Sequence, residues 1–450
     1  MLLRWFRSSP CIKFDNATTV RLGDSFNFRF GVPMISERNI AVVGLGYVGL
    51  PLAVALSKKF PVIGYDRDSQ RIAQLREGFD RTNEFERQTL EAASIRYSDD
   101  AADLRNANIY IVAVPTPVDA SNQPDLTALS GATELVGGVV QKGSIVVFES
   151  TVYPGVTEDI CGPILERVSG LKCGTDILLG YSPERINPGD TVHTVDKIVK
   201  IVAGQTTEVA KLLAEIYGSM NGEKIHVVKD IKTAEAAKVI ENAQRDINIA
   251  FMNEIAQIFG RLDISVYDVL EAANTKWNFL PFTPGLVGGH CIGVDPYYLA
   301  HAAKTAGFDP TVLLSGRAVN DAMAEYVADR ISENLESGST ILVLGLAFKE
   351  NVPDLRNSKV GDLVGRLKTN GHTVSVHDPL ADAAEALSEY GIKLCDDLPN
   401  NVDCVVGCVA HTAYHDLKFA NVLNEGGLIA DLKGVWRGAE AVKDFRYWTL

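Results

Sequence analysis

The stretch that most constrains the fold is residues 39–68, "NIAVVGLGYVGLPLAVALSKKFPVIGYDRD". It predicts an apolar strand, a glycine-rich turn, a helix of small and apolar residues, and a second strand ending at Asp66. Gly44, Gly46 and Gly49 form G-x-G-x-x-G: the first makes a tight turn, the second admits a pyrophosphate, and the third lets helix and strand pack closely. The helix N-terminus would face the phosphates. We therefore expect a dinucleotide site, with a glycine-rich packing turn as the alternative.

The residues at the end of the second strand indicate whether the dinucleotide is NAD or NADP. A carboxylate at Asp66 would accept hydrogen bonds from ribose hydroxyls and repel a 2′-phosphate, which favours NAD over NADP. Arg67 follows directly and could accommodate that phosphate. NAD is the expected cofactor, and Arg67 is the reason to test it.

Further along the chain, predicted strands alternate with helical stretches. A helical middle follows, and after it the strands return. In both halves a strand runs into a glycine turn, and a second strand ends at an aspartate. This rhythm predicts an α/β fold with two Rossmann-like, doubly wound parallel sheets joined by a helical region; one large sheet is the alternative. We expect strands within 109–117, 144–152, 176–185, 197–204, 340–348, 372–379, 403–411 and 427–434, and one long helix over 233–263. The predicted parts are an N-terminal extension (1–36, expected to be disordered), an NAD-binding domain (37–207), a central region (208–332) and a C-terminal domain (333–450).

Composition restricts the class of protein. The chain has 450 residues and a net charge of −14, which argues against a nucleic-acid or anionic membrane surface. No apolar run reaches the roughly 18–20 residues of a membrane span. There are seven cysteines and no Cys-x-x-Cys pair. Six we interpret as reduced structural thiols, Cys404 and Cys408 among them, which suits the cytoplasm.

The seventh cysteine lies in "PGLVGGHCIGVDP", residues 284–296. Cys291 could be a packing thiol, a metal ligand or a nucleophile. His290 is the only soft ligand beside it, so no metal site is expected. On the long helix, Lys238, Asn242 and Arg245, together with Ile249 and Asn253, are spaced to share one face. Such a polar stripe also fits a solvated helix face, and composition does not choose.

Seven motifs in order carry a specific resemblance: "VGLGYVGLPLA", "VPTP", "STVYPG", "SPERINPG", "KVIENAQRDINIAFMNE", "PGLVGGHCIGVDP" and "GLAFKENVPDLRNS". Over about residues 39–440 the chain closely resembles the UDP-glucose/GDP-mannose dehydrogenase family. The resemblance implies an NAD-dependent, four-electron oxidation of a sugar 6-hydroxymethyl group to a carboxylate. An aldehyde has no leaving group, so the second hydride must leave from a covalent adduct, which a cysteine thiolate can form.

The resemblance also implies roles for single residues. Cys291 matches the nucleophile, and Lys238 and Asn242 match residues that stabilise the developing oxyanion. Asp295 matches the aspartate that orients the hydrolytic water, although a simple turn aspartate before Pro296 would suit the sequence as well. Thr151 matches a threonine near the nicotinamide, and Glu184 an active-site glutamate. Family members often carry a second glutamate where this chain has Pro188, so a two-glutamate mechanism is not carried over.

Two larger sets follow from the motifs. The expected cofactor-binding residues are Gly44, Gly46, Tyr47, Val48, Gly49, Asp66, Arg71, Pro115, Thr116 and Thr151. The expected substrate-binding residues are Glu184, Arg185, Lys238, Asn242, Arg245, Phe279, Phe282, Gly285, Gly288, His290, Lys349 and Arg356. Asp354 belongs with Lys349 and Arg356 in the C-terminal motif, whose alternative is a surface loop of mixed charge.

The residues around Cys291 indicate which sugar the substrate carries. Members acting on UDP-glucose typically have Gly-Gly-Ser-Cys and a Lys-Asp pair, whereas this chain has His290 and Val294-Asp295. It resembles most the members that oxidise UDP-GlcNAc or UDP-GalNAc for surface polysaccharides. UDP-ManNAc, UDP-glucose or a catalytically silent nucleotide-sugar-binding protein are the alternatives. The family also implies a homodimer through the long helix.

Overall fold

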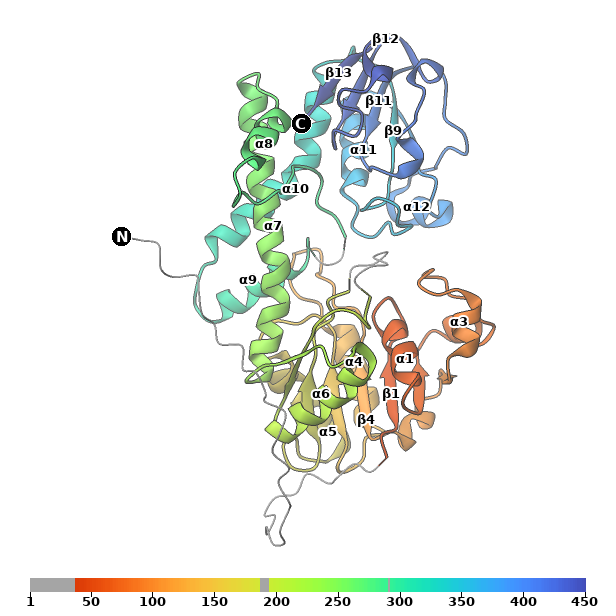
Figure 1. The fold of residues 1–450 in the computed structure, drawn as a ribbon, viewed down its shortest axis with the longest axis vertical. Helices are drawn as coiled ribbons and strands as arrows, with labels where there is room; N and C mark the ends of the chain where they lie inside the picture. Colours follow the sequence, from red (N-terminus) through yellow and green to blue (C-terminus); the bar gives the residue numbers. More distant parts are fainter. Residues whose placement is uncertain (1–36, 187–193, 290–291) are drawn as a thin grey trace. The chain divides into compact units, whose positions relative to one another are not determined.

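The computed structural model describes residues 37–186, 194–289 and 292–450, so the extension expected at 1–36 lies outside the described residues. Within these ranges the strands form two separate sheets, of eight and five strands, as the sequence predicts (Figure 1).

The first sheet has the order β3-β2-β1-β4-β5-β6-β7-β8, so its strand order reverses between β1 and β4. In doubly wound sheets ligands bind at the carboxyl edge beside such a reversal. The strands are β1 (Ile40–Val43), β2 (Val62–Tyr65), β3 (Ile95–Ser98), β4 (Ile109–Val112), β5 (Ile145–Phe148), β6 (Leu178–Tyr181), β7 (Lys200–Gly204) and β8 (Ile225–Val227).

One pair departs from the predicted parallel pattern. β6 and β7 are antiparallel, whereas the other neighbouring pairs of this sheet are parallel. The described residues between β6 and β7 contain no helix, and antiparallel neighbours need no crossover helix. The sheet continues to Val227, past residue 207, where we placed the end of the first domain; the boundary stays a prediction.

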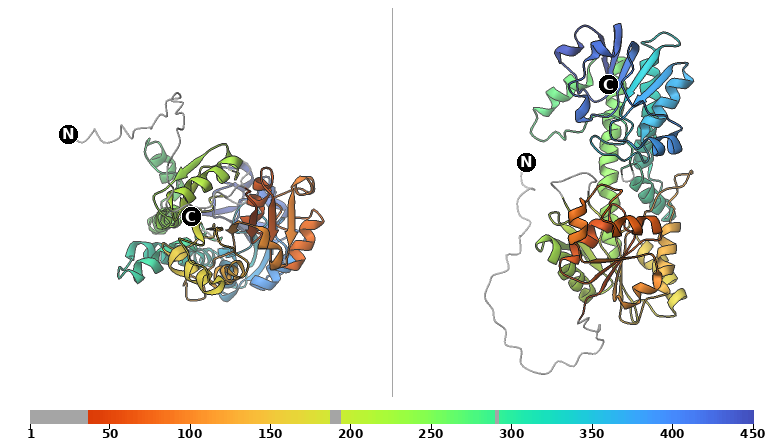
Figure 2. Two further views of the ribbon diagram at one scale, coloured as in Figure 1. Left: turned by 90° about the horizontal axis from the view of Figure 1, so that it is seen from below. Right: turned by 90° about the vertical axis from the view of Figure 1, so that its right-hand side faces the viewer.

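Helices lie on both faces of the first sheet (Figure 2). α1 packs against α6 on one side, and α4 packs against α5 on the other. This two-sided cover explains why β1, β4 and β5 are fully buried, continuous apolar strands. The helices are α1 (Gly49–Ser57), α2 (Ser69–Arg76), α3 (Arg87–Ala92), α4 (Thr127–Gly137), α5 (Gly162–Ser169) and α6 (Thr207–Asn221).

The second sheet is parallel throughout, in the order β10-β9-β11-β12-β13. Its order reverses between β9 and β11, which repeats the arrangement of the first sheet. The elements are β9 (Thr340–Leu344), α11 (Lys359–Thr369), β10 (Thr373–His377), α12 (Ala383–Tyr390), β11 (Val402–Gly407), β12 (Leu423–Asp431) and β13 (Arg446–Thr449).

The central region is built on one long helix, α7 (Ile231–Arg261), which confirms the helix predicted over 233–263 (Figure 1). α9 and α10 pack against α7. The other helices of this region are α8 (Val266–Asn274), α9 (Asp295–Thr305) and α10 (Thr311–Ser332).

The buried residues of α7 are mostly apolar, but three residues of the polar stripe are buried with them. Lys238, Asn242 and Asn253, from the polar stripe, are buried, while Ile240 and Phe251 are exposed. The solvated-face reading is therefore wrong for these three polar residues. The buried polar side chains have partners to bond, and among the described residues nothing covers the exposed apolar ones.

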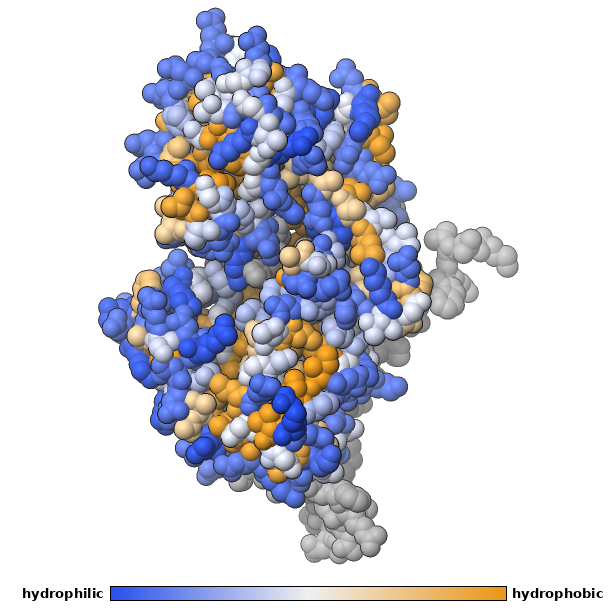
Figure 3. All heavy atoms as spheres, turned by 180° about the vertical axis from the view of Figure 1, so that it is seen from behind, coloured by the Kyte–Doolittle hydropathy of each residue, from blue (hydrophilic) through white to orange (hydrophobic). Residues whose placement is uncertain are grey.

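Cys404 and Cys408 are buried in the apolar core of the second sheet, as packing residues. No helix among the described residues is long and apolar enough to cross a membrane. The face in Figure 3 is mostly hydrophilic, with hydrophobic residues in separate patches.

Candidate active site

The glycine turn after β1 has the geometry that the motif predicts. Gly44 has φ +94°, and a Cβ there would lie 2.6 Å from the Ala113 carbonyl oxygen. A Cβ on Gly49 would lie 1.8 Å from the Gly44 carbonyl oxygen, so α1 can approach only without a side chain. A Cβ on Gly46 would meet nothing within 4 Å. The turn is thus closed on the protein side and open where a pyrophosphate would approach, which fits a dinucleotide.

Asp66 lies at this turn. Its carboxylate accepts hydrogen bonds from the backbone N–H groups of Leu45 (2.9 Å) and Asp68 (3.0 Å). Arg71 lies beneath the turn, because its Nε donates to the Leu45 carbonyl (3.0 Å) and its guanidinium pairs with Asp80 (2.8 Å). Arg71 is buried, so the structure gives it a role in supporting the loop; direct contact with the cofactor stays a prediction.

The remaining expected cofactor residues surround the same edge. Val48 immediately precedes α1, and Pro115 follows β4, across the reversal of strand order. The Thr116 hydroxyl donates to the Thr151 carbonyl (2.6 Å), which joins the loops after β4 and β5. The carboxyl ends of β1, β4 and β5 therefore bring these residues together.

The second sheet also has a glycine turn after its first strand, with an aspartate bonded to the backbone of that turn. Asp378 follows β10, and its Oδ2 accepts hydrogen bonds from the N–H groups of Leu346 (2.7 Å) and Ala347 (2.9 Å) after β9. Burial alone would raise the pKa of Asp378, but the His411 ring and the two amides outweigh it and lower the pKa below its ordinary value. Gly345 has φ +88°, and a Cβ there would lie 2.4 Å from the Val409 side chain. A second nucleotide-type turn therefore opens beside β9.

Three predicted catalytic side chains converge between α7 and α9. The Asn242 Nδ2 donates to the Asp295 Oδ2 (2.6 Å), and the Lys238 Nζ lies 3.6 Å from the same oxygen. Asp295 is buried at the first position of α9. Burial raises the pKa of Asp295, and Lys238 and Asn242 oppose that rise. Helix spacing on α7 explains this meeting, since residues four apart lie on one face.

A cleft of about 510 Å³ opens above this cluster. Gly289 and Ile292, the described residues on either side of the predicted nucleophile, both line it. Cys291 and His290 themselves lie outside the described residues. The other expected residues that line the cleft are Arg185, Lys238, Asn242, Arg245, Phe282, Gly285, Gly288, Lys349, Asp354 and Arg356.

Four expected residues do not line this cleft. Asp295 is buried at the start of α9. Glu184 is buried, and its Oε1 accepts hydrogen bonds from the N–H groups of Arg185 (2.6 Å) and Ile186, two residues that line the cleft. Phe279 packs on the core of the second sheet. Thr151 lies in the cofactor loop described above.

Two of the lining arginines are already paired. Arg185 contacts Glu241 of α7 (2.8 Å) and donates to the Val199 carbonyl (2.9 Å). Arg356 forms a two-pronged pair with Asp354 (2.9 and 2.6 Å) and stacks on the Tyr47 ring at 4.8 Å. The mixed-charge motif is therefore an organised pair that lines the cleft and touches the glycine turn.

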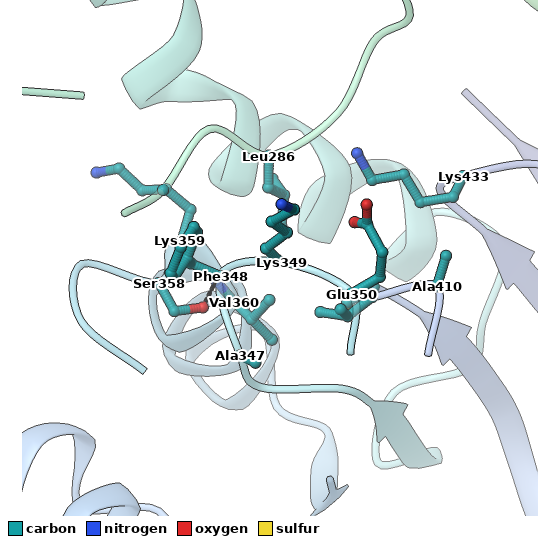
Figure 4. A pocket seen from close by; sticks show the side chains of 13 residues that line it. Leu286, Ala347, Phe348, Lys349, Glu350, Ser358, Lys359, Val360, Ala410 and Lys433 are labelled. Carbon is teal, nitrogen blue, oxygen red and sulfur yellow. Dashed lines mark hydrogen bonds between the residues drawn. The ribbon is translucent and has the colours of Figure 1, made fainter. Parts of the chain in front are cut away.

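Sequence reasoning missed Lys433, which lines both this cleft and a small neighbouring cavity of about 40 Å³. The side chains of Lys349, Glu350 and Lys433 point into the same space (Figure 4). Protein atoms around Lys433 lower its pKa through burial. The sequence could have indicated Lys433, because it follows Asp431 at the carboxyl end of β12, and ligands bind at this edge of such sheets.

Comparison with known proteins agrees with this geometry. The chain matches the UDP-glucose/GDP-mannose dehydrogenase family in its NAD binding domain (38–221), central domain (232–322) and UDP binding domain (342–438).

Individual relatives cover nearly the whole chain. It is 51% identical to Protein CapL of Staphylococcus aureus, over 92% of this chain and 100% of that protein. It is 48% identical to a UDP-N-acetyl-D-glucosamine 6-dehydrogenase of Pseudomonas aeruginosa, over 87% and 95%. The structure of UDP-D-ManNAc dehydrogenase from Pyrococcus horikoshii superposes with a TM-score of 0.82 at 30% identity, over 91% of this chain and 98% of that one. The chain therefore belongs to the UDP-glucose/GDP-mannose dehydrogenase family and is an NAD-dependent nucleotide-sugar dehydrogenase.

Proposed function

We propose that the protein oxidises the C6 hydroxymethyl group of a UDP-N-acetylhexosamine, UDP-GlcNAc first, to the uronic acid. The observation that carries this proposal is that Lys238 and Asn242 line the same cleft as Gly289 and Ile292. The buried Asp295 carboxylate contacts both of these side chains. The 48% identity to a UDP-N-acetyl-D-glucosamine 6-dehydrogenase supports the gluco series.

The first oxidation needs a proton and a hydride to leave the alcohol. NAD, when bound, supplies the two-electron acceptor for each of the two oxidations. Lys238 and Asn242 present an ammonium and an amide N–H toward the cleft, where they would hold the C6 oxygen as its negative charge develops. Lys238 and Asn242 are held in place by the buried Asp295 carboxylate.

The second oxidation needs a covalent adduct. The Cys291 thiolate would add to C6 of the aldehyde, and the resulting alkoxide would expel the second hydride to leave a thioester. Water would then add to the thioester carbon, the C–S bond would break, and the thiolate would leave. Asp295, next to the loop and buried, is the group that would orient this water.

Substrate choice follows from the polar groups of the sugar. An acetamido group brings an N–H donor and a C=O acceptor that UDP-glucose lacks. A pocket built to bond both would leave its own groups unpaired with UDP-glucose, a kind of mismatch that can discriminate by ~10⁴. We therefore expect kcat/KM for UDP-GlcNAc or UDP-GalNAc to exceed that for UDP-glucose by at least ~100-fold, a value set below the largest discrimination of this kind. The same assay should also measure kcat/KM for UDP-ManNAc, the alternative N-acetylhexosamine substrate.

Replacement of the nucleophile tests the mechanism. Cys291→Ala should lower acid formation by several orders of magnitude while NAD and substrate still bind, because covalent catalysis is removed. Cys395→Ala, at a half-buried thiol outside the cleft, is the matched control and should be fully active. A Cys291→Ala variant that still yields two NADH per sugar at near-normal rate would disprove the covalent route.

The expected setting of the enzyme is also part of this proposal. The exposed apolar residues of α7 support a homodimer through that helix. The described thiols are free, which suits a reducing compartment such as the cytoplasm. The resemblance of the motifs to the N-acetylhexosamine members that serve surface-polysaccharide synthesis makes a polysaccharide precursor the expected product.

A further inference from the structure

A buried asparagine of α7 holds the loop that forms one wall of the cleft. Asn253 lies one helical turn beyond Ile249, which lines the cleft. Asn253 itself is fully buried and is not among the lining residues. It bonds instead to Gly285, the first residue of the stretch 285–289, which lines the cleft along its whole length. The Asn253 side chain therefore lies behind this wall.

The Gly285 backbone engages both ends of the Asn253 amide. The Gly285 N–H donates to the Asn253 Oδ1 (2.8 Å), and the Asn253 Nδ2 donates to the Gly285 carbonyl (3.0 Å). A peptide N–H donates and a peptide carbonyl accepts, so this pair of bonds fixes the orientation of the amide. One side chain thus satisfies both polar backbone groups of a buried glycine.

A buried polar network in turn fixes Asn253. Its Nδ2 also donates to the Asn320 Oδ1 on α10 (2.8 Å). The Asn320 Nδ2 donates to the Asp246 carbonyl (3.0 Å) and to the Asp246 Oδ1 (2.8 Å), and Arg317 pairs with the same carboxylate (2.5 Å). The two asparagines and Asp246 are fully buried. Buried amides bonded at both ends make a polar network rigid, so α7 and α10 hold the Asn253 amide in one arrangement.

The opposite side of Gly285 faces the second sheet. A Cβ on Gly285 would lie 2.5 Å from the Lys433 Nζ. Gly285 and Lys433 both line the cleft. Because Asn253 bonds Gly285 from behind and Lys433 approaches it from the other side, the position of this glycine sets the shape of the cleft beside Lys433.

We propose that Asn253 is a positioning residue that holds the wall 285–289 in the arrangement that binds the nucleotide sugar. The inference rests on the proposed function, which places the nucleotide sugar in this cleft. A wall that is already ordered spares the ligand the cost of ordering it on binding. The cofactor is expected at the glycine turn after β1, which other elements build, so the two ligands should respond differently to a change at Asn253.

The test replaces Asn253 by alanine and by leucine. Asn253→Leu keeps nearly the shape of the side chain while removing its hydrogen bonds, so it leaves no cavity and serves where Asn253→Ala does not fold. The Kd for UDP, from titration calorimetry, and the KM for UDP-GlcNAc should each rise at least about 10-fold, because the freed wall must be ordered with its backbone groups unpaired. The KM for NAD should stay near the wild-type value.

Asn221→Ala and Asn221→Leu are the matched controls. Asn221 is also buried and also makes three hydrogen bonds, to the backbone of Ile198 (3.1 Å) and of Lys224 (2.9 and 3.1 Å), but it lies outside the cleft. These variants should lower the Tm, as the Asn253 variants do, and should leave the Kd for UDP and both KM values unchanged.

Three results would overturn the positioning role: an unchanged UDP affinity and sugar KM in folded Asn253 variants, an equal change in the Asn221 variants, or loss of folding in both Asn253 variants. The last would show that Asn253 serves the fold alone. A wild-type protein that binds UDP but forms no NADH from any UDP-sugar would overturn the proposed function, and the UDP affinities would still test Asn253.

Discussion

At the scale of single residues, Asp66 links the glycine turn to cofactor choice. Its carboxylate accepts a hydrogen bond from the Leu45 N–H, and the ribose hydroxyls of NAD are predicted to lie beside it. A hydrogen bond to a charged group contributes about 1.5–3 kcal/mol.

We therefore expect Asp66→Ala to weaken NAD binding by about 10- to 100-fold and to narrow the preference over NADP. Asp66→Asn is the matched variant: it keeps the shape, so it should narrow the preference with a smaller loss of NAD affinity. Titration of both dinucleotides against each variant measures this. If the wild-type protein already prefers NADP, Arg67 and not Asp66 reads the ribose.

Glu235 gives a pH signature in stability. This α7 carboxylate is buried and accepts hydrogen bonds from the N–H groups of Gly155 (2.6 Å) and Thr157 (2.9 Å). Burial raises its pKa from 4.5 to about 7. The unfolded chain ionises this group at lower pH than the folded one does. Its contribution to stability is therefore complete below pH 4.5 and is lost as the pH rises through about 7.

Glu235→Gln removes this titration. The destabilisation caused by the substitution should shrink by about 2–3 kcal/mol between pH 5 and pH 8, because only the wild type loses stability over that range. Denaturant unfolding at both pH values measures it, with Glu254→Gln, exposed on the same helix, as the control. A pH-independent difference would show that Glu235 is already ionised at pH 5.

At the scale of elements, α7 shows what sequence patterns can and cannot give. Absence of proline and of glycine before residue 260 predicted the length of the helix correctly. Its two stripes were visible too, but not which one is buried. That depends on partners from distant segments: Asp295 binds Asn242, and Asn320 and Gly285 bind Asn253. Hydrophobicity alone favours the opposite orientation.

Some residues of the candidate site could be predicted from the sequence and others could not. Residues within motifs were found because each motif requires its own backbone geometry, as at Gly44 and Gly49. Lys433 was missed because it lies outside the motifs and meets the site only through the order of strands in the sheet.

The exposed apolar side of α7 predicts an interface between two copies of the chain. Phe251 is 56% exposed there, and Phe251→Glu would bury a charge in any such interface. The variant should shift toward the monomer in analytical ultracentrifugation. Phe79→Glu, at 54% exposure on a loop before α3, is the matched control and should leave the oligomeric state unchanged. A wild-type protein that sediments as a monomer would contradict the dimer.

At the scale of the whole molecule, the family match begins at residue 38, and the motifs lie downstream of it. A chain starting at Met34 should therefore keep its fold and its turnover number. Thermal unfolding and initial rates of the full and shortened chains make the comparison. A Tm lower by several degrees in the shortened chain would show that the first 33 residues pack on the enzyme.

The most direct test of the central claim is the number of NADH molecules formed per sugar. With limiting UDP-GlcNAc and excess NAD, the proposed four-electron oxidation predicts two NADH per sugar. In the same assay, kcat/KM should be at least ~100-fold above that for UDP-glucose. One NADH per sugar, or comparable turnover of UDP-glucose, would contradict the account.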